Sequence, residues 1–336
     1  PRGGFMRPFV SFFGLFWLCA SFGACGGDDG GGGSGGGTSG ATCVPKSDAC
    51  YVAGPSGPGA NCLAKFDNTG ADVWQGRISQ ITVKAPDVLA SKFVHDAILD
   101  RGISLNQPEC FEQGEGTFSW LFEFNKTTGK LRTGGGLPVK DPIAGGCFLT
   151  LSTTALPIAP ITTDVTIDAD GLGFTASNID VVVPIFNTPD STDNPILLPL
   201  HAVELNGKFS DDSHNCIGTH NGPTLDPSLS CRGDFNDGER PFTSGASLKG
   251  YIRVDEADKV FIEDLDTTLC VYLAGITKWN GPSKNCESSD IWIAGQRPEG
   301  DWCAATNAPA DATCKDAWLL SADFSASAFK INGDCP

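Results

Sequence analysis

Cysteine is the residue that most constrains what this chain can fold into. The 336-residue sequence holds 14 cysteines, of which twelve follow Gly26, and no two have a C-x-x-C spacing. Without that spacing, neither a zinc ribbon nor a thioredoxin-type redox motif is indicated, whereas an even number favours disulfides in an oxidising compartment. We expect disulfides among Cys43, Cys50, Cys62, Cys110, Cys147, Cys216, Cys231, Cys270, Cys286, Cys303, Cys314 and Cys335. The short spacings make Cys216–Cys231 and Cys303–Cys314 the expected local pairs.

The N-terminal region has the layout of a signal peptide. Arg7 follows Met6, and an uncharged segment rich in Phe, Leu and Trp then runs to Ala24. This segment is short for a membrane span of about 20 residues, and it ends in small residues rather than basic ones. The arrangement therefore favours cleavage.

The end of this apolar segment, Phe22-Gly23-Ala24-Cys25, resembles the lipobox of bacterial lipoproteins. In that family a lipid is attached to the cysteine and the peptide is cut before it. The resemblance implies that Cys25 is the lipid-attachment site and the mature N-terminus, although Phe22 stands where these lipoproteins usually carry Leu. The alternatives are an ordinary secretory peptide cut near Ala24 and an uncleaved anchor.

A glycine-rich tether follows Cys25 and extends to about Thr42. Such a composition cannot bury apolar surface, so we expect a flexible coil with a root-mean-square reach of roughly 20–25 Å. Because Gly26 and not Asp follows the cysteine, the resemblance implies delivery to the outer membrane. Both a periplasmic and a cell-surface orientation stay open.

The chain divides into three regions on composition. We expect a signal peptide at 1–24, the lipidated cysteine and tether at 25–42, and a disulfide-rich globular domain at 43–336. Within that domain, 43–68 reads as a stapled cap, 69–275 as the main sheet and helices, and 276–336 as a Cys/Trp-rich C-terminal part. A net charge of −17 without a Lys/Arg cluster argues against nucleic acid as a partner.

Alternating apolar residues predict a long run of strands. The clearest is a strand and turn within 117–132, where Phe118, Trp120, Phe122 and Phe124 share one face. Further strands are expected at 76–83, 147–154, 162–167, 173–185, 197–209, 216–218, 248–254 and 317–331. Helical spacing predicts two amphipathic helices, at 86–102 and 256–273. The fold class is therefore α+β and β-dominated, with a long antiparallel meander, curved or sandwich-like, two helices and disulfide-stapled ends.

Two sets of aromatic residues suggest binding sites. The face formed by Phe118, Trp120, Phe122 and Phe124 could line a cavity for a hydrophobic ligand, although such residues more often form a core. Trp279, Trp292 and Trp302 lie among cysteines near the C-terminus and could stack on a glycan, or pack against the disulfides.

The sequence contains no catalytic motif and no defined metal site. Asp168–Gly171 and Asp234–Glu239 resemble parts of calcium loops, but neither has the distal Glu, so we expect no cofactor except, at most, calcium. The expected function is a lipid-anchored cell-envelope protein, a non-enzymatic binding or structural module that could take a hydrophobic ligand. The alternative is a surface lipoprotein that binds or processes glycans.

Overall fold

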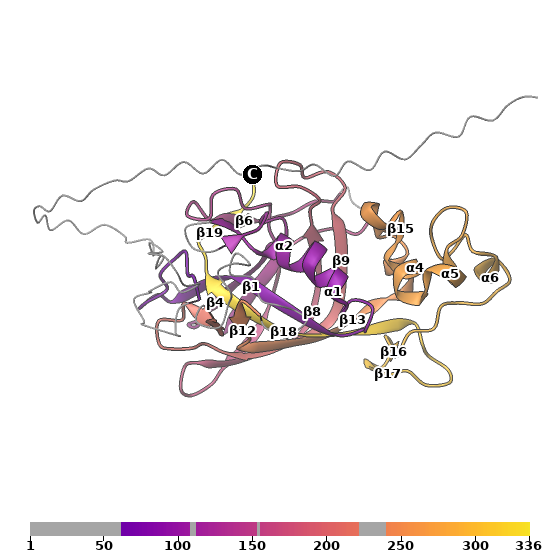
Figure 1. Ribbon diagram of the computed structural model, residues 1–336. Coiled ribbons are helices and arrows are strands. Elements are labelled where there is room, and N and C mark those ends of the chain that lie inside the picture. The colour runs from indigo at the N-terminus through magenta and orange to yellow at the C-terminus, as the bar shows by residue number, and fades with distance from the viewer. Residues whose placement is uncertain (1–61, 108–111, 153–154, 222–239) are drawn as a thin grey trace, which may run out of the picture. The chain divides into compact units, whose positions relative to one another are not determined.

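The dominant feature of the fold is an antiparallel sheet that closes on itself (Figure 1). The computed structural model describes residues 62–107, 112–152, 155–221 and 240–336, which belong to one compact unit. Strand β1 pairs with β4 on one side and with β18 on the other, which closes the ring. In order around it lie β1 (Val73–Ala85), β4 (Trp120–Asn125), β5 (Lys130–Gly135), β7 (Ile161–Ile167), β8 (Gly173–Ile185), β9 (Ile196–Lys208), β13 (Ala246–Arg253) and β18 (Ala317–Ala328).

The predicted aromatic hairpin is present as β4 and β5. Its turn forms because the Asn125 side chain accepts hydrogen bonds from the backbone N–H groups of Thr127 and Thr128 (3.1 and 3.0 Å), and Gly129 adopts a positive φ of 63°. The prediction for β8 is confirmed at both ends, and the strands predicted from 162, 197 and 248 are confirmed within two residues at their starts. The β-dominated antiparallel fold class is therefore confirmed.

The other strands in the described part of the chain are short. Strands β10 (Cys216–Ile217) and β16 (Trp302–Cys303) pair with β18, and β6 (Gly146–Phe148) pairs in parallel with β19 (Ile331–Asp334). The remaining pairs join β16 to β17 (Ala308–Pro309), β2 (Asn106–Gln107) to β3 (Glu112–Gln113), β11 (Thr219–His220) to β12 (Phe242–Thr243), and β14 (Phe261–Ile262) to β15 (Thr267–Thr268).

The first predicted helix begins later than its pattern suggested. Residues 86–90 form turns, and Ser91 is extended and caps the helix, with its Oγ accepting from the Val94 N–H at 3.4 Å. The helix runs through α1 (Lys92–Val94), a π-helical turn (His95–Leu99) and α2 (Asp100–Ile103). Phe93, predicted on the buried face, is exposed, whereas Val94 and Leu99 are buried.

The prediction of a single second helix at 256–273 was wrong. The segment contains α3 (Val254–Ala257), β14, a 3-10 turn (Glu263–Leu265), β15 and α4 (Leu269–Ala274). Asp266 adopts a left-handed conformation (φ 49°) that ends the 3-10 turn, and Thr268 then caps α4. Two further one-turn helices follow, α5 (Ile276–Trp279) and α6 (Asp290–Ile293). No helix within the described residues is long and apolar enough to cross a membrane.

Four disulfides connect described cysteines. Cys303–Cys314 is confirmed, whereas Cys216–Cys231 was wrong, because Cys216 is bonded to Cys62, 154 residues away. The other two are Cys147–Cys335 and Cys270–Cys286. Cys43, Cys50, Cys110 and Cys231 lie outside the described residues, as do Cys25 and the tether. Strand β18 comes from the predicted C-terminal part, so the main sheet draws on both 69–275 and 276–336.

Candidate functional site

The predicted aromatic face lies inside the closed sheet and is completely buried. Phe118, Trp120, Phe122 and Phe124 have exposed fractions of 1%, 0%, 1% and 3%. The Trp120 indole N–H donates to Thr133 Oγ1 at 2.8 Å, so its polar group has a partner within the protein. Side chains that lined a large open cavity would retain accessible surface, so these four are packed mainly against protein atoms.

Aromatic side chains from strands that are not adjacent in the closed sheet meet across its interior. The Phe124 ring on β4 lies 4.9 Å from that of Phe174 on β8 and 5.4 Å from that of Phe209, next to the end of β9. Trp74 on β1 also reaches Phe209, at 5.3 Å. Such tilted and edge-on pairs are favourable core contacts. The aromatic face thus fills this part of the interior.

A small void remains at the end of the sheet beside Trp74 and Phe124. Its volume is about 10 Å³, and most of its lining is apolar. One water molecule needs roughly this much space, so a lipid cannot enter it. His214 closes this end by stacking on Trp74 (3.7 Å between ring centroids), and its Nε2 lies 3.0 Å from the Gly171 carbonyl oxygen.

The three tryptophans considered for glycan binding do not form one exposed row. Trp279 and Trp302 are only 4% and 5% exposed. The Trp302 indole N–H donates to Asn307 Oδ1 at 3.1 Å. Trp292 is half-buried, and the Arg297 guanidinium lies 4.2 Å from its ring centroid. Trp292 is therefore the single residue of this set with surface left for a ligand.

The structure assembles a charged cluster that the sequence did not indicate. His201 on β9 has its Nε2 2.5 Å from Glu256 of α3 and its Nδ1 3.4 Å from Asp180 on β8. Its ring stacks on Tyr251 of β13, at 5.5 Å between centroids. The Asp180 carboxylate also accepts from the Ala202 N–H at 2.8 Å, where β8 and β9 are out of regular register.

The two carboxylates determine the protonation of His201. The hydrogen bond to Glu256 raises the pKa of His201 above its ordinary value, burial opposes the rise, and the charges of Glu256 and Asp180 add to it. Both ring nitrogens face carboxylates, which favours the protonated imidazole. The cluster is thus a clamp between β8, β9 and α3. No signal in the sequence could have found it, since Asp180, His201 and Glu256 are far apart along the chain.

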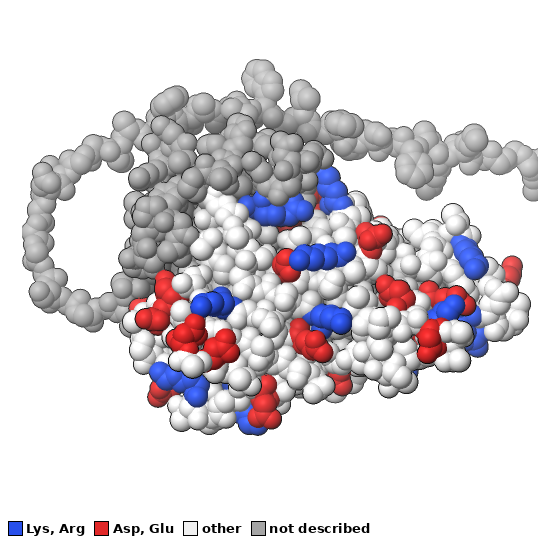
Figure 2. Space-filling model, turned by 90° about the horizontal axis from the view of Figure 1, so that it is seen from below, with Lys and Arg blue, Asp and Glu red and all other residues white. Residues whose placement is uncertain are grey.

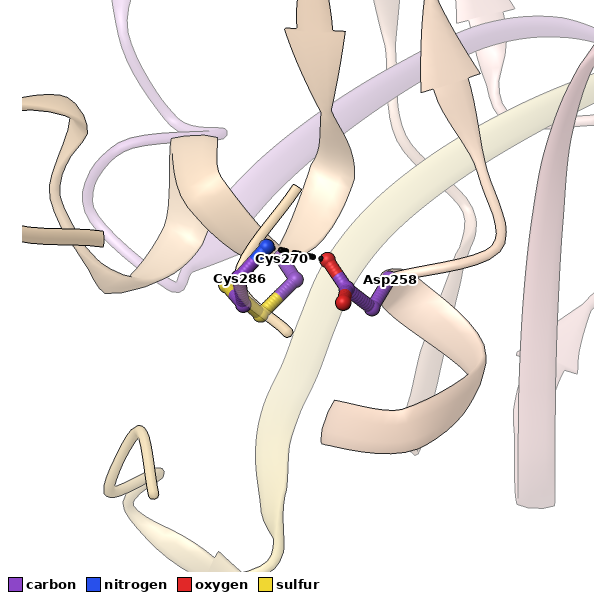
Figure 3. A group of neighbouring side chains, drawn as sticks. All are labelled: Asp258, Cys270 and Cys286. Carbon is purple, nitrogen blue, oxygen red and sulfur yellow. Dashed lines mark hydrogen bonds between the residues drawn. A yellow bond between two sulfur atoms is a disulfide. The ribbon is translucent and has the colours of Figure 1, made fainter. Parts of the chain in front are cut away.

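Two sets of Cys and Asp side chains lie close enough together to bind a metal ion, but their ligand atoms already form disulfides and hydrogen bonds. In the first, Cys270 and Cys286 form a disulfide beside Asp258 (Figure 3). The Asp258 carboxylate accepts from the backbone N–H groups of Cys286 and Glu287 at 2.7 and 2.9 Å and from the Thr268 hydroxyl at 2.8 Å. In the second, Cys303 and Cys314 are disulfide-bonded next to Asp316. Neither group offers a thiolate to a metal.

The first calcium-like loop is a closed turn between β7 and β8. Asp170 accepts from the N–H groups of Leu172 and Gly173 at 2.9 and 3.3 Å, and Lys208 donates to it at 2.8 Å. These hydrogen bonds, that from Lys208 foremost, lower the pKa of Asp170 to about 2. The carboxylate is therefore engaged without an ion. The second loop, Asp234–Glu239, lies outside the described residues.

The charged side chains are mixed on the face that Figure 2 displays. Lys and Arg are interspersed there with Asp and Glu. Ion pairs between such side chains in the described part of the chain include Lys130–Asp164 (2.6 Å) and Lys140–Asp190 (2.9 Å). The described residues on this face form no broad basic area that could follow a nucleic-acid backbone.

Comparison with known proteins does not add a family or function to this geometry. No family model matches the chain. The searches among curated proteins and among solved structures give no match either.

Proposed function

We propose that this chain is a lipid-anchored protein of the bacterial outer membrane whose folded domain is a non-enzymatic binding or structural module. The disulfides are the observation that carries this proposal. Cys62–Cys216 and Cys147–Cys335 join segments 154 and 188 residues apart. Disulfides of this kind persist in oxidising compartments such as the periplasm and the cell surface. The lipobox-like segment at Cys25 is in keeping with that location.

The packed interior formed by the described residues favours a structural role over the binding of a hydrophobic ligand inside the sheet. Rings from opposite strands meet in the centre, and the void beside Trp74 has a volume of about 10 Å³. For the glycan alternative, Trp292 is the residue that remains available.

Metabolic labelling with a fatty acid tests the anchor. We expect label on the wild-type protein and on the control variant Cys19→Ser, because Cys19 lies in the signal peptide that is removed. The variant Cys25→Ser should carry none. Label that persists on Cys25→Ser would refute the lipid attachment at this position.

A further inference from the structure

A glycosylation triplet stands at the turn of the hairpin between β4 and β5. Asn125-Lys126-Thr127 is the one Asn-X-Ser/Thr sequence of the chain in which X is not proline. Such a triplet is the acceptor of N-linked glycans in exported proteins, provided that it lies on the surface. The disulfides already support export, so the exposure and geometry of the triplet decide whether it can be used.

The triplet lies on the outer surface of the closed sheet. Side chains alternate between the two faces along β4, so Phe122 and Phe124 point into the core and Asn125, at the end of the strand, points outward. Asn125 is half-buried, and residues 126–128 are exposed. A group attached to the Asn125 side chain would therefore extend into solvent without entering the core.

The turn engages only one end of the asparagine amide. Asn125 Oδ1 accepts hydrogen bonds from the backbone N–H groups of Thr127 and Thr128, at 3.1 and 3.0 Å. Nδ2 is the atom to which an N-linked glycan is attached, and it donates to no residue in the described part of the chain. Because oxygen and nitrogen lie on opposite sides of Cγ in the planar amide, Nδ2 faces away from the backbone of the turn. The nitrogen is therefore the end of the amide that is open to reaction.

The same hydrogen bonds favour a reaction at this nitrogen. An amide nitrogen becomes nucleophilic when it loses a proton, and the negative charge then spreads to the amide oxygen. The two N–H groups directed at Oδ1 stabilise that charge, as fixed donors do wherever an oxyanion develops. The Thr127 side chain is exposed in the same turn, so its hydroxyl is available for recognition by an enzyme.

We propose that Asn125 carries an N-linked oligosaccharide. The donor is an oligosaccharide joined to a membrane lipid through pyrophosphate, and a glycosyltransferase outside the cytoplasm performs the transfer. A bond forms between Nδ2 and the anomeric carbon of the sugar, and the bond from that carbon to the pyrophosphate oxygen breaks. The lipid pyrophosphate leaves, and the Nδ2 proton passes to a base of the transferase. The inference rests on the export that is part of the proposed function, but not on the lipid at Cys25.

Peptide mass spectrometry of the protein isolated from its native envelope tests the assignment. We expect the wild-type peptide that contains Asn125 to carry a glycan and to release sugar fragment ions. Asn125→Asp should lose the glycan, because this change keeps the oxygen that accepts in the turn and removes the nitrogen. Thr127→Ala should also lose it, although the backbone N–H at 127 still donates to Asn125. The matched control Thr128→Ala leaves the triplet intact and should be glycosylated like the wild type.

Three results would overturn the glycosylation. They are an unmodified Asn125 in the wild type, a glycan that persists in Thr127→Ala, and a glycan that persists in Asn125→Asp, which would then be attached to a hydroxyl group. The Cys25 peptide of the same sample separates this proposal from the anchor. A glycan on Asn125 together with an unlipidated Cys25 overturns the anchor alone, whereas a lipid on Cys25 together with an unmodified Asn125 overturns the glycosylation alone.

Discussion

Replacement of Phe124 by alanine distinguishes a filled core from a ligand cavity. Burial of a phenyl group stabilises by about 1.5–3 kcal/mol. The ring pairs with Phe174 and Phe209, at 4.9 and 5.4 Å, add about 0.5–1.5 kcal/mol each. These values agree with the usual cost of about 3–5 kcal/mol for Phe→Ala in a core. We expect a loss of that size in the free energy of unfolding.

Thermal unfolding followed by circular dichroism measures this loss. At about 2 °C per kcal/mol for a domain of this size, the Tm should fall by roughly 6–10 °C. The exposed control Ile143→Ala should change the stability by less than about 0.5 kcal/mol. A Phe124→Ala protein with the same Tm as this control would refute the packing argument and reopen the ligand cavity.

Three further predictions follow from the contacts described above. Replacing Cys147 and Cys335 by serine should destabilise the protein by about 5 kcal/mol, because the bond closes a loop of 188 residues; an unchanged urea midpoint would contradict this. His201 has a raised pKa, so its stabilisation is complete below about pH 6.5 and declines as the pH rises through the folded-state pKa. The difference in urea midpoint between wild type and His201→Gln should therefore shrink from pH 6 to pH 9, and a constant difference would count against the clamp with Glu256. Asp258→Asn should cost about 1–3 kcal/mol and speed hydrogen exchange at 286–287, whereas wild-type exchange there would argue against the capping role.

Strands were predictable where apolar and polar residues alternate along the sequence. The pattern from Gly173 to Ile185 predicted β8 at both ends, and the aromatic alternation predicted the hairpin of β4 and β5. These strands bury one face against the shared core, so their periodicity is imposed directly on the sequence. The closure of the sheet was not predictable in this way. It depends on pairing Gly76 with Ala328, which no local pattern encodes.

The prediction of helix boundaries failed where polar residues end a helix that the apolar spacing would continue. Val260 and Leu269 are both buried, as a helix at 256–273 would require. Between them, however, Asp266 turns the chain through a left-handed conformation, and Thr268 starts a new helix. Periodicity alone could not distinguish one long helix from short pieces that bury the same residues.

The candidate sites were the least predictable part. Aromatic alternation identified Phe118 to Phe124 but could not tell a core from a cavity, since both bury one face. The exposure of Ile276 and Ile293 was not predictable, because both look like ordinary core residues in the sequence.

Intact-mass and peptide analysis of the protein isolated from its native envelope tests the central claim most directly. The account predicts a mature chain that begins at Cys25, a lipid on that residue, and a mass twelve protons below the fully reduced chain, from the twelve remaining cysteines. A mature N-terminus elsewhere, or an unmodified Cys25 with free thiols throughout, would contradict it.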